Sequence, residues 1–240
     1  MAAATLSPAR RTALESLATD LRRIFGNRLY SLCAYGQPAD DVETRSIALV
    51  DRLAFEDLAA CVPLARTWDG LGLAVPLILE RDEFARTLDV FPLEYGEIIA
   101  HHVHVYGDDP FERLSVSEVD LRRGCELQAK SHLIHLREGF LETYGEPRAV
   151  ARLIAASAPA FSRLLTNLVT LVSSDASDGP PDDVAAAAER YLGVPSDLVR
   201  EVTTTGGDKP STIVDPTALL SRYIAAVERL WEFVDTWKRA

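Results

Sequence analysis

The sequence predicts an α+β chain, in which a small mixed-sheet domain with flanking helices precedes an all-helical bundle. Two observations predict this fold class. In the first third of the chain, short apolar runs bounded by turn residues alternate with helical patterns. The second half carries long stretches whose apolar residues recur every three or four positions. We therefore expect two domains, residues 1–110 and residues 111–240.

The first domain is expected to open with a helix. Ser7 is a favourable N-cap residue, and Pro8 suits the first helical position because a proline there loses no intrahelical hydrogen bond. Apolar residues then follow at helical spacing as far as Phe25. The pair Gly26-Asn27 is expected to end this helix.

Three strands are expected after this helix. Residues 29–35 form a buried apolar run that leads into Gly36, and residues 47–50 form a second run. Residues 55–68 have helical spacing, and residues 73–79 read as a third strand. The order strand, strand, helix, strand predicts a sheet with helices packed on it.

The pattern changes after Asp89, beyond which we expect no further strand. Ser117 and Asp120 resemble a capping box, and Asp215-Pro216 resembles another helix start. The long apolar stripes after these residues predict a packed bundle. Helices are expected over residues 94–106, 117–144, 148–172 and 215–237.

The composition limits the classes of function. The chain has 36 acidic and 25 basic residues, a formal net charge of −11. This balance disfavours binding of nucleic acid or an anionic membrane over a broad surface, because both require dense positive charge. The three cysteines lie far apart without a CxxC pair, so we expect buried, reduced thiols and neither a disulfide framework nor a thiolate zinc site.

No segment reads as a membrane or secretion signal. The N-terminal residues lack an apolar core of signal-peptide length. Residues 149–172 are the most apolar stretch, but Arg152, Pro159 and Arg163 interrupt it, and charges near a bilayer centre are costly. We therefore expect a soluble, cytoplasmic protein with no membrane partner.

The first two predicted strands carry a resemblance to a known family. The first ends in Tyr35-Gly36-Gln37, and the second reads Ser46-Ile47-Ala48-Leu49-Val50. With the helix before them, they resemble the nucleotidyltransferase fold of the polymerase-beta superfamily. In that family the first strand ends in Gly-Ser or Gly-Gly, and the second carries an Asp-hydrophobic-Asp pair. Alternate strand positions share a face, so both carboxylates can hold the divalent ions that bridge nucleotide phosphates.

The resemblance implies a degenerate site. Gly36 matches the family glycine, which allows close approach of phosphates, whereas Gln37 replaces the small residue. Ser46 and Ala48 stand where the two aspartates belong, and neither binds magnesium as a carboxylate does. The resemblance also extends to the bundles attached to minimal nucleotidyltransferases. It therefore implies no catalytic residue and no cofactor, and magnesium with a nucleotide only if other acids replace the missing pair.

Three other acids near this site have two interpretations. Asp40 and Asp41 lie in the predicted turn, and Asp51 ends the second strand. They are either solvated surface acids, as is usual for such positions, or the basis of a non-standard metal site.

The five histidines fall into two groups. His101 and His104 are three residues apart, as are His132 and His135, so each pair could share one face of a helix. If those helices pack together, four imidazoles could bind zinc or another transition metal. The alternative is that they are interface or surface residues, and no ligand spacing assigns a metal.

The sequence leaves three functions open. The leading hypothesis is a catalytically degenerate nucleotidyltransferase-like protein that binds a nucleotide or a protein partner in a regulatory role. The second is an active, metal-dependent nucleotidyltransferase that modifies a small molecule or macromolecule through a non-standard acid set. The third is a structural homodimer joined through the bundle.

Overall fold

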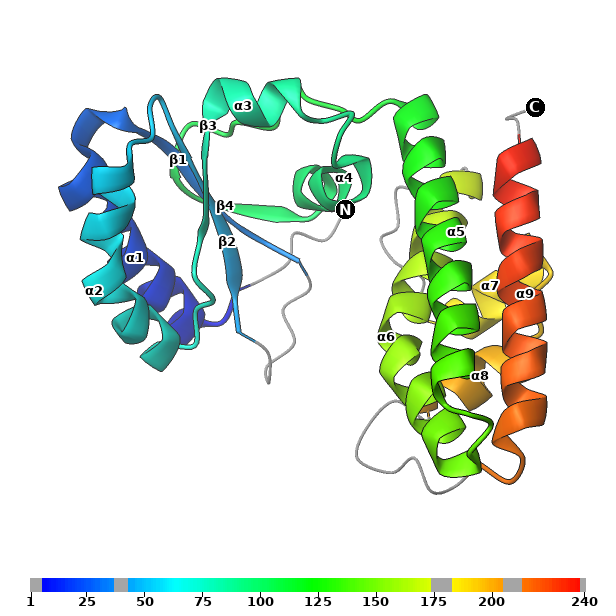
Figure 1. Ribbon diagram of the computed structural model, residues 1–240. Coiled ribbons are helices and arrows are strands. Elements are labelled where there is room, and N and C mark those ends of the chain that lie inside the picture. Colours follow the sequence, from blue (N-terminus) through cyan, green and yellow to red (C-terminus); the bar gives the residue numbers. More distant parts are fainter. Residues whose placement is uncertain (1–5, 37–42, 174–182, 205–212, 238–240) are drawn as a thin grey trace. The chain divides into compact units, whose positions relative to one another are not determined.

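The computed structural model describes residues 6–36, 43–173, 183–204 and 213–237 (Figure 1). They form a mixed α+β structure, as the sequence predicts, and its sheet has four strands where three were expected. The chain divides into two compact units, residues 1–117 and 118–240. Residues 111–117, which were expected in the second domain, therefore belong to the first unit. No helix in the described ranges is long and apolar enough to cross a membrane.

The sheet belongs to the first unit and has the strand order β3-β2-β1-β4. Strand β1 (Leu29–Tyr35) lies near its centre and pairs antiparallel with β2 (Arg45–Val50) and with β4 (His102–Gly107). Strand β3 (Leu77–Glu80) pairs parallel with β2. The first two strands confirm the predicted ones, and β2 begins two positions earlier than expected.

Strand β4 shows that the predicted helix over residues 94–106 was wrong in its second half. Helix α4 (Pro92–Ala100) ends before the strand begins. In the segment His102–Gly107, histidines alternate with valines, a period of two that suits a strand at the edge of a sheet. The third strand was also misplaced, because Leu73 forms only an isolated bridge with Thr44 and β3 starts at Leu77.

Helices cover both faces of the sheet (Figure 1). Helix α1 (Pro8–Phe25) and helix α2 (Phe55–Gly70) share one apolar core with the sheet, and this core includes Trp68. Helix α1 begins as predicted, since the Ser7 side chain accepts a hydrogen bond from the Arg10 N–H. A short 3-10 turn, η1 (Gly26–Arg28), then leads into β1.

The opposite face of the sheet has its own apolar core beneath helix α3 (Arg81–Arg86) and helix α4. At its centre Phe84 stacks on Tyr95 with ring centroids 4.4 Å apart, and Phe111 packs against Phe84 at 5.2 Å. This second core closes the face of the sheet that would otherwise be open to solvent.

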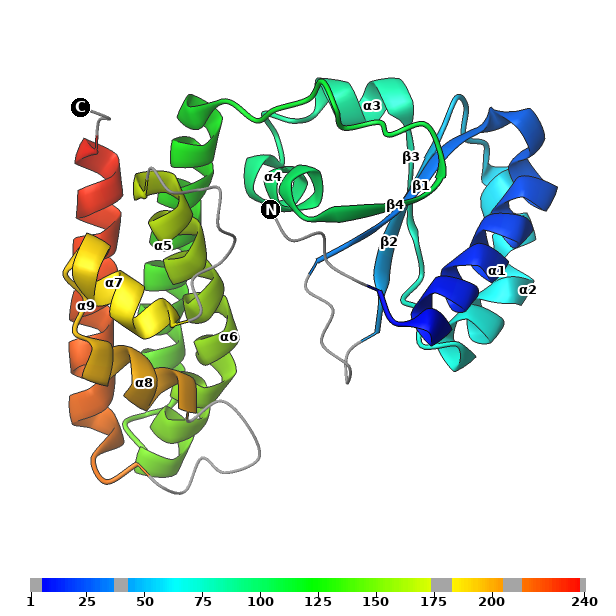
Figure 2. The ribbon, with the colours of Figure 1, turned by 180° about the vertical axis from the view of Figure 1, so that it is seen from behind.

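The second unit contains only helices among its described residues. Helix α9 (Pro216–Thr236) begins as predicted, with the Asp215 side chain accepting from the Ala218 N–H. The two short helices, α7 (Val184–Leu192) and α8 (Ser196–Thr204), pack against α6 (Pro147–Val172) (Figure 2). All three cysteines of the chain are free and buried, as expected. The helices of this unit are α5 (Glu118–Glu142), α6 (Pro147–Val172), α7 (Val184–Leu192), α8 (Ser196–Thr204) and α9 (Pro216–Thr236).

Candidate functional site

The two positions that correspond to the missing aspartates are buried. Ala48 is fully buried in the core beneath α1 and α2, and Ser46 lies two residues earlier on the same face of β2 with 1% of its surface exposed. The Ser46 hydroxyl has no hydrogen-bond partner in the part of the chain that is described. The intervening Ile47 packs in the opposite core. A carboxylate at position 46 or 48 would therefore be buried against helices, not open to a nucleotide.

The other candidate residues do not form a metal site in the part of the chain that the structure describes. Gln37, Asp40 and Asp41 lie outside the described residues. Asp51 is exposed at the end of β2, and its backbone N–H donates to the Arg28 carbonyl at 2.9 Å. Across the described ranges, no group of three or more His, Cys, Asp or Glu side chains could hold a metal ion.

The predicted pairing of histidines on two helices was wrong for the first group. His101 follows the last residue of α4, and His104 lies on β4. His132 and His135 do lie on α5, but only His135 is exposed. His132 is buried and shares a 2.6 Å hydrogen bond with the Tyr223 hydroxyl, so its ring is part of the bundle interior.

Polar side chains do gather beside Gly36, at the end of β1. Tyr35 is the register partner of Arg45 on β2 and of His102 on β4. Directly opposite residues of antiparallel strands share one face of the sheet, so the three side chains are neighbours. Two acids, one on α4 and one after β4, complete the group. We call it the Gly36 cluster, and its members are Tyr35, Gly36, Arg45, Glu97, His102 and Asp109.

Arg45 lies against the glycine of this cluster. Gly36 has a φ of 84°, a conformation that favours glycine. A Cβ atom there would lie 2.5 Å from an Arg45 guanidinium nitrogen, so the arginine fills the space that a side chain would need. The guanidinium also lies 5.1 Å from the Tyr35 ring centroid and 3.3 Å from a Glu97 carboxylate oxygen. The Arg45 side chain is 48% exposed, so its charge is accessible to a ligand.

Each ring nitrogen of His102 has an acceptor within hydrogen-bonding distance, and a neutral ring donates to one of them. Its Nδ1 lies 2.9 Å from the Ile99 carbonyl, and its Nε2 lies 3.2 Å from Asp109 Oδ2. Burial opposes ionisation of Asp109, but hydrogen bonds from the Phe111 N–H and from His102 hold the pKa of this carboxyl below its usual value. Burial also raises the pKa of the Tyr35 phenol, so this group remains protonated.

The Gly36 cluster offers an exposed guanidinium to an anion, and its two carboxylates are engaged by Arg45 and by His102. An exposed guanidinium forms strong charge-assisted hydrogen bonds with phosphate or carboxylate, often two at once. Gly36 was predicted from the sequence, whereas Arg45, Glu97, His102 and Asp109 were not. The available signal was the alternation at His102–Gly107, which is typical of a strand, but its pairing with β1 is seen only in the structure.

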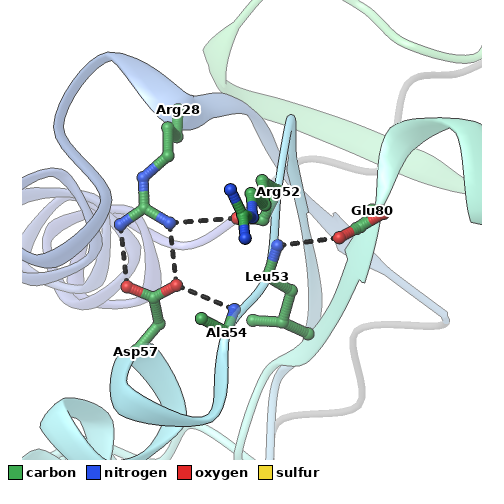
Figure 3. A network of polar contacts seen from close by, with 6 residues as sticks. All are labelled: Arg28, Arg52, Leu53, Ala54, Asp57 and Glu80. Carbon is green, nitrogen blue, oxygen red and sulfur yellow. Dashed lines mark hydrogen bonds and ion pairs between the residues drawn. The ribbon is translucent and has the colours of Figure 1, made fainter.

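A second polar network lies at the opposite end of β1 (Figure 3). Arg28 forms two hydrogen bonds of 2.7 Å with the Asp57 carboxylate, and a third of 3.1 Å with the Arg52 carbonyl. The Ala54 N–H donates to Asp57, and the Leu53 N–H donates to Glu80 at the end of β3. These carboxylates therefore fix the turn between β2 and α2.

Replacing Asp57 with asparagine is expected to lower the free energy of unfolding of the first unit by about 2 kcal/mol at neutral pH, through loss of charged hydrogen bonds. The hydrogen bonds from Arg28 lower the pKa of Asp57 to about 2. Their stabilisation is complete above the unfolded pKa of about 3.9 and is lost as the pH falls towards about 2.

Urea unfolding at several pH values measures both effects. The variant should lose this acid-dependent part of the stability, whereas Asp82→Asn, whose side chain is 84% exposed, should retain it. Equal behaviour of the two variants would mean that the Arg28–Asp57 pair contributes nothing measurable.

Comparison with known proteins assigns the chain to no family. No protein-family model matches it, and no curated protein is significantly similar to it. A function must therefore be inferred from the described residues themselves.

Proposed function

We propose that the first unit is a nucleotidyltransferase-like module that binds a nucleotide without catalysing transfer, and that Arg45, on the face of β2 opposite Ser46 and Ala48, neutralises phosphate charge without a metal ion. The observation that carries this proposal is the Arg45 guanidinium against Gly36. The sequence resemblance places a phosphate-approaching glycine at this position, and an arginine is the side chain best suited to a phosphate.

The geometry allows a phosphate to replace the present partner of Arg45. The Arg45–Glu97 pair is 3.3 Å long, and both side chains are almost half exposed. Exposed pairs of this kind contribute about 0–1 kcal/mol, so Glu97 is readily displaced. A phosphate group brings more charge than one carboxylate and can accept two parallel N–H bonds from the guanidinium.

An active transferase is the weaker alternative. The Ser46 and Ala48 positions are buried, and the described acids form no metal-binding group. Such an enzyme would need acids from outside the described residues, among them Asp40 and Asp41. Release of pyrophosphate from a nucleoside triphosphate, dependent on magnesium or manganese, would establish it.

A bundle-mediated homodimer is favoured by one separate observation. Helix α5 carries Leu127, Ile134 and Leu141 at seven-residue spacing, and these side chains are 72%, 42% and 73% exposed. An apolar stripe of this period is typical of a seam between helices. A dimer of this kind is compatible with nucleotide binding by the first unit. A strictly monomeric mass in solution would exclude the dimer.

Replacing Arg45 with glutamine is expected to weaken ATP binding by about tenfold or more, because charged hydrogen bonds contribute about 1.5–3 kcal/mol each. Isothermal titration in the presence of EDTA measures this effect in the full chain. The matched control is Arg66→Gln, which removes an exposed arginine of α2 and should leave the affinity unchanged. Equal affinities of the two variants would contradict a role for Arg45.

A further inference from the structure

A separate pocket opens at the C-terminal end of α1. It has a volume of about 320 Å³, within the lower range of small-molecule sites. Its walls come from the last turns of α1, the turn η1 and strand β4. Since η1 precedes β1 whereas Gly36 follows it, this pocket lies at the other end of that strand from the Gly36 cluster. The lining residues are Thr19, Arg22, Arg23, Gly26, Asn27 and Tyr106.

Two arginine side chains of the last turn of α1 bring positive charge to the pocket. It is lined by two arginines and by no carboxylate. Arg23 forms an ion pair of 3.2 Å with Asp20, whose other oxygen accepts from the Trp68 indole N–H at 3.0 Å. Arg22 has no carboxylate within ion-pairing distance among the described residues.

Arg22 is also held in an orientation that suits recognition. Its guanidinium lies 5.2 Å from the centroid of the Tyr106 ring. Stacking on an aromatic ring restricts the guanidinium while leaving its edge N–H groups available to a bidentate acceptor. Asn27 can add a neutral amide donor, whereas the Thr19 hydroxyl already donates to the Glu15 carbonyl.

We infer that this pocket binds a small organic anion, with a phosphate or carboxylate group on the guanidinium of Arg22 and a planar group beside Tyr106. The volume admits a compact ligand and not a large one. Arg22, which has no ion pair among the described residues, favours an oxyanion over a cation or a neutral molecule. The inference is independent of nucleotide binding at the Gly36 cluster, because the two sites share no residue.

Nuclear magnetic resonance of the full ¹⁵N-labelled chain tests this site with two probes, inorganic phosphate and phenyl phosphate. At constant ionic strength, phenyl phosphate should cause saturable shifts of the Gly26, Asn27 and Tyr106 amides. Saturation by inorganic phosphate with the same affinity would show that the anion alone is recognised and would overturn the planar-group assignment. Absence of saturable shifts with both probes would overturn the site.

Two variants on the same helix identify the residue responsible. Arg22→Gln should weaken phenyl phosphate binding by about tenfold or more, whereas Arg11→Gln, which removes an exposed arginine outside the pocket, should leave it unchanged. Equal weakening by both variants would indicate nonspecific attraction and would overturn the assignment. Arg45→Gln should retain binding here, so failure at one site is distinguishable from failure at the other.

Discussion

Acidification is expected to destabilise the helical unit by up to about 3 kcal/mol as the pH falls from about 6.5 to about 4. The cause is His132, which is 9% exposed on α5 and stacks on Phe161 with a centroid separation of 6.1 Å. Burial, with a contribution from His135, lowers the pKa of His132 from 6.5 to about 4. The unfolded chain therefore binds the proton first, and the stabilisation is complete only above about pH 6.5.

Urea unfolding followed by circular dichroism measures this dependence. His132→Gln should flatten the stability profile between about pH 6.5 and pH 4, because glutamine can still form a hydrogen bond with Tyr223 but does not titrate. His135→Gln replaces an exposed histidine of the same helix and should preserve most of the slope. An unchanged slope in the His132 variant would show that other groups cause the acid sensitivity. The Asp57 effect occurs at lower pH, so the two transitions separate.

Truncation of Trp68 to alanine is expected to lower the free energy of unfolding of the first unit by about 4 kcal/mol, the usual cost of removing a large buried aromatic side chain. Trp68 is 1% exposed and belongs to the core between α2, α1 and the sheet. Its indole N–H also donates to Asp20, so the truncation leaves that carboxylate with one partner fewer.

Trp68→Phe separates the two contributions. Phenylalanine retains most of the apolar volume but removes the hydrogen bond to Asp20, so we expect a distinctly smaller loss than for alanine. Amide hydrogen exchange in α1 and α2 measures the stability of the first unit separately from that of the second. Equal losses for the two variants would mean that the hydrogen bond, and not the packing, dominates the contribution of Trp68.

Local signals in the sequence were sufficient for several elements. The Ser7-Pro8 pair and the Gly26 stop predicted α1 because capping depends on adjacent residues. The run Leu29–Tyr35 predicted β1 because a continuous apolar segment between breakers suits a central strand. Asp215 likewise predicted the start of α9.

Strand β4 was missed because its segment was interpreted as the second half of a helix over residues 94–106. Its polar positions are histidines, which interrupt an apolar run, and its pairing partner β1 lies about seventy residues earlier in the chain. The Gly36 cluster depends on this pairing. Arg45, Glu97 and His102 come from three separate elements, and no spacing along the chain indicates that they meet. Gly36 was predicted because it directly follows the apolar run of the first predicted strand.

Isothermal titration of the full chain with ATP, first in EDTA and then in magnesium, tests metal-independent nucleotide binding most directly. If Arg45 neutralises the phosphates without a metal ion, ATP should bind saturably in EDTA, magnesium should not be required, and no pyrophosphate should appear. Binding that occurs only with magnesium and is accompanied by pyrophosphate release would contradict the proposed function and establish an active transferase.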